Sequence, residues 1–205
     1  MALNNDAIFT AAKGHVYTAP IPASPAALVV RPTPAEIAAF DPAVGLGAGW
    51  NELGHTDRED LPEFGFEGGD TETRGTWQNA VMREVITEAA TDYLILTLNQ
   101  FDEEALSLYY GVENSADALA GEYVVDDVAT ATVERSMAMV VIDGDYKIGF
   151  YAPKVSIRRD DSMEMAIDEF TKMPLRMSFL KQEPRGASTY PLFVWINGEI
   201  NAVAS

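Results

Sequence analysis

Residues 131–159 read ATVERSMAMVVIDGDYKIGFYAPKVSIRR, and they decide the fold class of this chain. Two segments rich in β-branched and aromatic residues flank the turn sequence Asp143-Gly144-Asp145. An Asp-Gly turn between two such segments is typical of a β-hairpin. We therefore expect two long antiparallel strands here, joined by a tight turn.

Further strands are expected on the C-terminal side of this hairpin. After a break at 160–162, the pattern predicts strands over 163–173 and 175–183, divided near Pro174, and a last short strand over 192–196. Short strands at this spacing are typical of a β-sandwich or barrel. The predicted fold class is mainly β: an antiparallel sandwich or barrel-like subunit with one short flanking α-helix, a long hairpin and an extended N-terminal arm.

The clearest helix is predicted over residues 101–111, FDEEALSLYYG. Asp102 suits the N-cap position, and the two glutamates that follow it place negative charge where the helix dipole favours it. Gly111 suits the C-terminal end. The expected buried face consists of Phe101, Ala105, Leu108 and Tyr109.

A charged hairpin is expected over residues 61–75, LPEFGFEGGDTETRG. Gly68-Gly69 permits a reversal of the chain between its two strands. Phe64 and Phe66 alternate with acidic residues, so the phenylalanines should face protein while the carboxylates face solvent.

The next segment, residues 81–100, divides at Ala89-Ala90 into two parts rich in β-branched residues. Both parts are expected to form strands. A single helix is the alternative for the first part.

Residues 19–49 form a proline-rich stretch, with prolines at 20, 22, 25, 32, 34 and 42. Proline removes a backbone donor, so these positions oppose a central strand or a long helix. The stretch is too apolar for a solvated linker, and we expect an arm that packs on another surface, with a neighbouring subunit as one candidate. The predicted organisation is an extended arm over 1–49 and a single β domain with a C-terminal extension over 50–205.

The composition excludes several classes of function. The chain has 205 residues, of which 47% are hydrophobic, and a formal net charge of −18. Nucleic-acid binding depends on Lys and Arg that displace counterions, so this chain should repel a duplex. Residues 52–72 hold eight acids against Arg58 alone, and residues 102–127 hold eight acids and no base. The absence of cysteine excludes disulfides, thiolate metal sites and cysteine nucleophiles.

Targeting signals are also not expected. The sequence MALNNDAIFTAAKGHVYTAP at the start lacks a basic region followed by an apolar one, and no later run reaches the roughly 18 apolar residues of a membrane span. We expect a soluble protein that the general export route does not secrete.

Motifs for catalysis and metal binding are incomplete. His55-Thr56-Asp57 has the spacing that begins a two-histidine, one-carboxylate iron site, but the other histidine, His15, lies upstream. No stretch fits the calcium-loop template, and Gly45 to Gly49 lacks the strand and helix of a dinucleotide loop. The sequence therefore predicts no catalytic residue, no metal ligand and no cofactor.

Four segments together resemble the major tail proteins of long-tailed bacteriophages, in particular those of actinobacterial hosts. They are GWNELGHTDREDLPEFGFEGGDTETRGTW, NQFDEEALSLYYG, DGDYKIGFYAPKVSIRRDD and LRMSFLKQE, which span about residues 50–183. The resemblance implies a β-sandwich or barrel-like subunit that assembles into hexameric rings, which stack as a tail tube. It also implies three kinds of partner: the tape measure protein inside the tube, the tail terminator and distal tail proteins at its ends, and DNA that passes without specific binding. The implied location is the virion tail, after assembly in the host cytoplasm.

An acidic channel would offer phosphates no counter-charge, so DNA should slide through it without adhering. On this interpretation the carboxylates of the hairpin region line the lumen or join one ring to the next. The candidate residues are Glu52, Asp57, Glu59, Asp60, Glu63, Glu67, Asp70 and Glu72. The candidate apolar residues of the subunit interface are Leu28, Val29, Val30, Phe40, Phe64 and Phe66.

Three alternatives remain open at this point. A carbohydrate-binding or adhesion module predicts a surface cluster of aromatic residues, whereas Trp50, Trp77 and Trp195 are scattered along the chain. A hydrolase would use an acidic pair such as Glu63 and Glu67. A different virion component, for example a head decoration protein, would share the composition.

Overall fold

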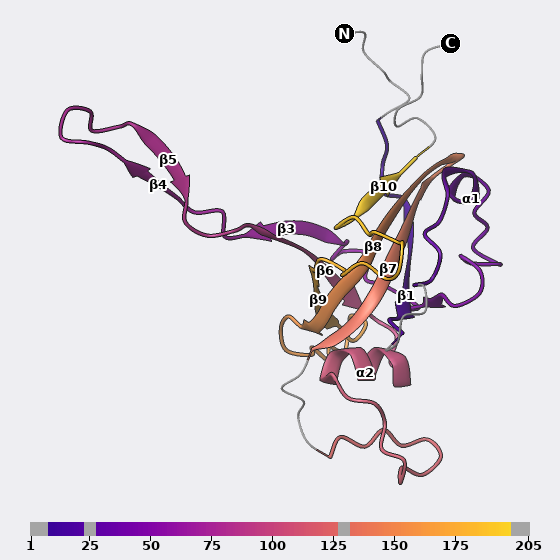
Figure 1. Ribbon diagram of the computed structural model, residues 1–205. Coiled ribbons are helices and arrows are strands. Elements are labelled where there is room, and N and C mark those ends of the chain that lie inside the picture. The colour runs from indigo at the N-terminus through magenta and orange to yellow at the C-terminus, as the bar shows by residue number, and fades with distance from the viewer. Residues whose placement is uncertain (1–7, 23–27, 127–131, 198–205) are drawn as a thin grey trace.

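The computed structural model describes residues 8–22, 28–126 and 132–197, which form an antiparallel, mainly β subunit with two short helices (Figure 1). This confirms the predicted fold class, although one more helix is present than expected. In chain order the elements are β1 (Lys13–Pro20), α1 (Pro34–Ala38), β2 (Asn51–Glu52), β3 (Glu63–Glu67), β4 (Thr71–Arg74), β5 (Arg83–Ile86), β6 (Thr91–Leu98), α2 (Glu103–Tyr110), β7 (Val133–Asp143), β8 (Tyr146–Arg159), β9 (Met173–Phe179) and β10 (Val194–Ile196).

The main sheet has the strand order β2-β1-β7-β8-β9-β6-β3, and β10 pairs with β8 beside this path. All pairs are antiparallel, and the described strands β2 and β3 stay at opposite ends of the order, so the sheet does not close into a barrel. The strand β8 is long enough to pair with β10 through Gly149 and with β9 through Val155.

The two strands expected around Asp143-Gly144-Asp145 are present as β7 and β8, and they lie in the middle of the sheet order. Successive residues of β7 point to opposite faces, so Met137 and Met139 enter one core while Ala138 and Val140 enter the other. Strands covered on both faces are apolar at nearly every position, which explains the run MAMVVI.

A bulge between Arg135 and Met137 accommodates Pro153, which has no N–H for the ladder. There the buried Ser136 donates its hydroxyl hydrogen to the carbonyl of Pro153 at 2.8 Å. The carbonyl of Pro153 therefore accepts a hydrogen bond from a side chain at the point where the strand pairing is interrupted.

The described part of the proline-rich stretch packs on its own subunit. Thr33 caps α1, with Glu36 completing a capping box and Pro34 in the first turn. Ile37 and Phe40 join the core on this face, and Lys147 donates to the carbonyl of Phe40 at 2.8 Å. The expected extended arm is thus a folded cover of the sheet, because its apolar residues find partners in the same chain. Residues 23–27 lie outside the described chain.

Helix α2 covers the opposite face of the sheet and confirms the predicted helix. The Asp102 carboxylate accepts from the N–H of Ala105 at 2.9 Å, and Gly111 ends the helix at φ 75°, where a residue with a Cβ would be strained. Ala105, Leu108 and Tyr109 are buried as expected, but Phe101 is 54% exposed. Phe101 precedes the first turn, so the helical spacing does not apply to it.

The predicted strand over 163–173 is wrong for most of its length. Only Glu164 and Lys172 form an isolated bridge, and the residues between them form a loop. Met165, Ile167 and Phe170 are exposed, so their spacing imitates a strand without a sheet to cover them. The strand β9 starts at Met173 and passes through Pro174 instead of ending there.

The predicted reversal at Gly68-Gly69 is also wrong. The chain continues past these glycines into β4, turns near Thr76 and Asn79, and returns through β5 and β6. Both glycines adopt positive φ, and Gly69 donates to the carbonyl of Glu88, so the segment is a kink inside one long hairpin. Strands β5 and β6 confirm the two strands predicted within residues 81–100, and β5 occupies the part for which a helix was the alternative.

Candidate assembly surfaces

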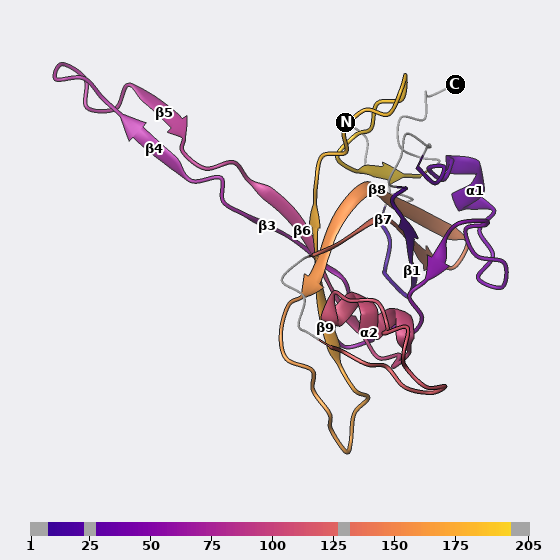
Figure 2. The ribbon, with the colours of Figure 1, turned by 60° about the horizontal axis from the view of Figure 1, so that its bottom comes forward.

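The long hairpin over residues 63–98 projects far from the body of the subunit (Figures 1 and 2). Its proximal half, β3 with β6, belongs to the main sheet, and its distal half, β4 with β5, forms a separate two-stranded sheet. At about 3.3 Å per residue, the stretch 70–76 alone extends roughly 20 Å. The distal half is therefore placed to contact another molecule.

Aromatic packing anchors the base of this hairpin. The ring of Phe64 lies 5.0 Å from the ring of Phe150 and 5.0 Å from that of Trp195, measured between centroids. Tilted and edge-to-face rings at such distances stabilise beyond the area that they bury. Phe64 therefore packs against protein although 39% of it stays exposed, whereas Phe66, two residues further out, is 70% exposed.

Arg176 contacts the hairpin at Glu67, the last residue of β3. Its guanidinium lies 2.6 Å from the Glu67 carboxylate, and its central carbon lies 3.7 Å from the centre of the Tyr93 ring. A Cβ at Gly65 would meet that ring at 2.5 Å, so the glycine makes the stacking possible. This combination of ion pair and cation–π contact fixes the direction in which the hairpin leaves the sheet.

The distal half of the hairpin exposes apolar side chains on a small, uncovered ladder. Trp77 is fully exposed at the tip, and Val81, Met82 and Ile86 are each at least 65% exposed. An isolated two-stranded ribbon is marginally stable in water, and contiguous exposed apolar residues mark interaction sites. These side chains are therefore the strongest candidates for a contact with a partner.

The tip also carries two arginines that stand directly opposite each other, Arg74 and Arg83. Like charges in a cross-strand pair destabilise a ladder. Arg74 contacts Glu72 at 3.3 Å in an exposed position, and Arg83 has no ion-pair partner among the residues that the structure describes. The decapeptide RGTWQNAVMR contains no carboxylate, which makes the tip cationic in an otherwise acidic chain.

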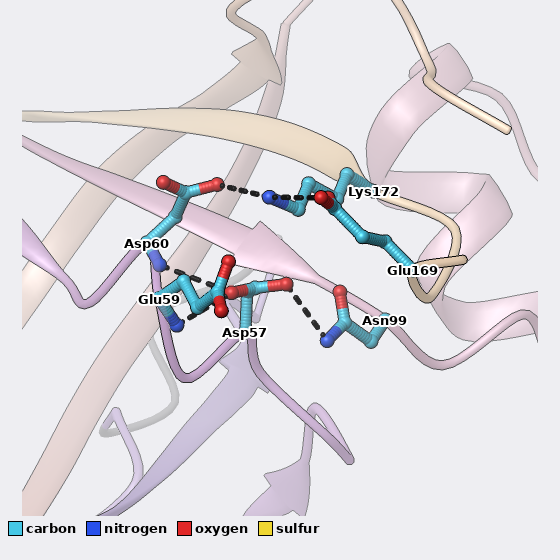
Figure 3. Close-up of polar contacts among 6 residues, drawn as sticks. All are labelled: Asp57, Glu59, Asp60, Asn99, Glu169 and Lys172. Carbon is cyan, nitrogen blue, oxygen red and sulfur yellow. Dashed lines mark hydrogen bonds and ion pairs between the residues drawn. The ribbon is translucent and has the colours of Figure 1, made fainter. Parts of the chain in front are cut away.

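The loop that leads into the hairpin is built around the buried carboxylate of Asp57 (Figure 3). One carboxylate oxygen accepts from the N–H groups of Glu59 at 2.7 Å and Asp60 at 3.0 Å, and the other accepts from the Asn99 side chain at 3.1 Å. Burial acts to raise the pKa of Asp57, but these hydrogen bonds outweigh it and lower the pKa below its ordinary value. Asp57 therefore acts as an internal brace of the loop.

Lys172 joins this loop to the 163–172 segment. Its ammonium lies 3.0 Å from Asp60 and 3.3 Å from Glu169 (Figure 3). The hydrogen bond with Asp60, followed by that with Glu169, raises the pKa of Lys172 above its ordinary value. Nothing in the sequence pattern brings residue 172 to residue 60, because the contact depends on the pairing of β6 with β9.

The eight candidate acids do not form one stripe in the subunit. Glu52 lies in β2 at one end of the sheet and bonds His15 at 2.6 Å, whereas Glu63 and Glu67 lie in β3 at the other end. Four more of the eight have partners named above: Asp57, Asp60, Glu67 and Glu72. Glu59, Glu63 and Asp70 are exposed, and no side-chain ion pair is present for these three among the described residues.

The six candidate apolar residues are distributed between core and surface. Leu28 and Phe40 are 5% exposed within their own subunit, and Phe64 is anchored as described above. Val29 is half-buried, where one methyl group lies 3.3 Å from the Cβ position of Gly49. Val30 and Phe66 are exposed and remain available to a partner.

Metal-binding and membrane-spanning features are absent from the part of the chain that the structure describes. No group of three or more His, Cys, Asp or Glu side chains is arranged to hold a metal ion within residues 8–22, 28–126 and 132–197. Neither of the two helices in those ranges has the length and apolar character that crossing a membrane requires.

Comparison with known proteins gives two concordant results. A family model described as phage tail tube protein matches residues 1–205. The chain is 43% identical to the major tail protein Gp23 of Mycobacterium phage D29 over 204 residues, which is 98% of this chain and 96% of the relative. It is 41% identical to the major tail protein Gp23 of Mycobacterium phage L5, with the same coverage of both chains.

Proposed function

Because this chain belongs to the phage tail tube protein family, we propose that copies of it close into hexameric rings that stack to form the tube of a virion tail. The family match agrees with the four sequence segments that resemble tail proteins of actinobacterial phages. The structural role in the tail comes from the family, and the ring geometry is our proposal.

The projecting hairpin is the observation that carries the proposal. A subunit that exposes an apolar ribbon at one place and apolar or acidic surface at another is suited to contacts between unlike surfaces of identical chains. Such heterologous contacts generate rings where the rotation closes and filaments where it does not. The open sheet edges at β2 and β3 offer further backbone groups for pairing between subunits.

We further propose that the exposed carboxylates Glu59, Glu63 and Asp70 contribute to an acidic lumen. In a hexamer each inward carboxylate appears six times, so a few residues per subunit suffice to repel phosphate. Asp57 does not belong to this set, because both oxygens of its buried carboxylate accept hydrogen bonds within the subunit. The lumen would hold the tape measure protein and later conduct DNA, while tail terminator and distal tail proteins would bind the two ends. Assembly of the tail in the host cytoplasm belongs to the same proposal.

Electron microscopy of the purified full chain tests this function. We expect rings or tubes of uniform bore as the protein concentration rises. Dispersed monomers at all concentrations, or filaments without a central channel, would contradict the proposal. The second candidate, a carbohydrate-binding module, gains no support, because the aromatic residues around Phe150 form a packed cluster at the hairpin base.

A further inference from the structure

The hairpin tip, with two arginines and the exposed Trp77, is complementary to an acidic, partly apolar surface. Its own body does not supply one, because both views place the tip far from helix α2 and its following loop (Figures 1 and 2). A surface that covers the tip would therefore belong to another molecule. In a tube built from this protein the most abundant neighbour is a second copy of the same chain.

Three grooves on the described surface differ in the charges that line them. The groove beside β1 has a volume of about 840 Å³, and its lining combines the cations of Lys13 and Arg58 with the carboxylates of Glu52 and Asp57. The groove beside the 163–172 loop, of about 750 Å³, is lined by the carboxylates of Glu59, Asp168 and Glu169 but also by the cations of Arg58 and Lys172, and Lys172 pairs with Glu169. Both grooves therefore contain cations that would oppose the approach of an arginine pair.

The third groove lies between α2 and the segment that follows it, with a volume of about 780 Å³. Its lining residues include Phe101, Glu103, Tyr110, Leu119, Glu122 and Tyr123, and no Lys, Arg or His is among them. Tyr110 and Tyr123 stack with their ring centres 6.4 Å apart, and Phe101 and Leu119 are more than half exposed. The groove is therefore aromatic at its floor and acidic at its rim.

The acidic residues around this groove give it a negative potential. Residues 102–126 carry seven acids and no base. Burial is the main cause that raises the pKa of Tyr123, and the carboxylate of Glu103 raises it further because a nearby negative charge opposes formation of the phenolate. An approaching guanidinium would meet unneutralised carboxylates rather than existing ion pairs.

We propose that the hairpin tip, residues 74–83, docks into the groove between α2 and residues 113–125 of a second copy of this chain. Trp77 enters between Phe101 and Leu119 of the partner copy and stacks near the tyrosine pair. The opposed arginines meet Glu103 and Glu122 at the rim, which removes the repulsion that they create in the free ribbon. The contact joins unlike surfaces and therefore propagates from copy to copy.

This inference rests on the proposed function, since it names the surface that receives the hairpin. The absence of native cysteine allows a direct test by crosslinking. A Gln78→Cys variant is mixed with a Leu119→Cys variant, assembled, and oxidised. We expect a disulfide-linked dimer of the two variants at a yield at least ten times that of the control mixture, Gln78→Cys with Ala12→Cys, which places the second thiol in the groove beside β1.

Charge exchange provides the second arm of the test. Arg83→Glu should raise the protein concentration needed for assembly at least tenfold, and Glu103→Arg introduced in the same chain should restore most of that loss. The matched control, Arg58→Glu, should leave the concentration nearly unchanged. The free subunits should keep the circular dichroism and melting temperature of the wild type.

The results distinguish a failure of the docking site from a failure of tube assembly. If the Gln78→Cys and Leu119→Cys variants assemble into tubes but form no disulfide on oxidation, the proposed docking site is wrong although the tube is real. The same conclusion follows if Arg83→Glu assembles as readily as the wild type. A wild-type protein that forms no assembly under any condition would overturn both.

Discussion

At the residue scale, Arg176 combines two interactions that lysine cannot reproduce together. A planar guanidinium can lie over Tyr93 and still reach Glu67, whereas an ammonium lacks the flat face and the fork of donors. We predict that Arg176→Lys lowers the free energy of unfolding by about 1–2 kcal/mol, which urea titration of the free subunit would measure.

Arg74→Lys is the matched control, because Arg74 also pairs with a glutamate but is 64% exposed. It should change the stability by less than about 0.5 kcal/mol. Equal effects of the two substitutions would show that stacking on Tyr93 contributes nothing.

Asp57 predicts a specific dependence of stability on pH. Its pKa is lower in the folded protein than the roughly 3.9 of an unfolded chain. The folded state therefore binds the proton less readily, and the stabilisation is complete above the unfolded pKa and is lost as the pH falls through the folded one. Asp57→Asn removes the charge that the surrounding donors favour.

We predict that Asp57→Asn costs about 1.5–3 kcal/mol at pH 7, and that the difference from the wild type shrinks as the pH falls below about 4. Urea titrations at pH 7 and pH 3 would measure it, with the exposed Glu59→Gln as control. A difference that stays constant between the two pH values would refute the assigned role of the carboxylate.

Single residues also explain why α2 could be predicted from the sequence and α1 was not. Asp102 and Gly111 announce α2, because caps act locally and can be recognised without a fold. Thr33, Pro34 and Glu36 announce α1 in the same way, but the proline content of the stretch argued against any helix. The capping box is the signal that would have found it.

At the element scale, α1 and the residues that follow it belong to the core of their own subunit. Ile37 is 1% exposed and approaches Gly149 so closely that a Cβ there would lie 2.7 Å from its terminal methyl carbon. We predict that Ile37→Ala destabilises the isolated subunit by about 2–4 kcal/mol. Thermal and urea unfolding of unassembled protein would measure this loss.

Val30→Ala is the control for that substitution, because Val30 is 79% exposed. It should change the stability of the free subunit by less than about 0.5 kcal/mol. If Ile37→Ala were equally neutral, the 28–49 segment would need a neighbouring subunit to hold it, as the composition first suggested.

The distal hairpin should be dispensable for folding and required for assembly. The N–H of Thr87 donates to the carbonyl of Asp70 at 2.8 Å, so an Asn-Gly turn joining these two residues would preserve the register of the remaining strands. We predict that this shortened chain keeps a melting temperature within a few degrees of the wild type but forms no tubes. Calorimetry and negative-stain microscopy would test the two halves of the prediction.

The hairpin also marks the limit of local sequence reasoning. Gly68-Gly69 has the composition of a turn, and only the pairing of β3 with β6 and of β4 with β5 reveals it as a kink. Likewise, alternating apolar residues predict a strand over 163–173, although no strand within the described residues covers them. Alternation reports which residues need a partner, and the partner can lie in another molecule.

At the scale of the whole molecule, the charge of −18 per chain sets how a tube would treat DNA. The sequence identifies the excess of acid, but which carboxylates face inward depends on packing between copies, which no local pattern encodes. The proposed lumen residues are therefore tested best by reversing their charge in assembled tubes.

We predict that wild-type tubes neither bind a short DNA duplex nor protect it from nuclease, because a carboxylate-lined bore offers phosphate no counter-charge. Glu59→Lys combined with Glu63→Lys should create binding that weakens steeply with added salt, together with protection from nuclease. Asp145→Lys combined with Glu183→Lys gives the same net charge at other exposed positions. DNA is protected from nuclease only when it lies inside the bore, whereas it can bind without protection on any outer surface. Equal protection by the two double variants would therefore contradict the placement of Glu59 and Glu63 in the lumen.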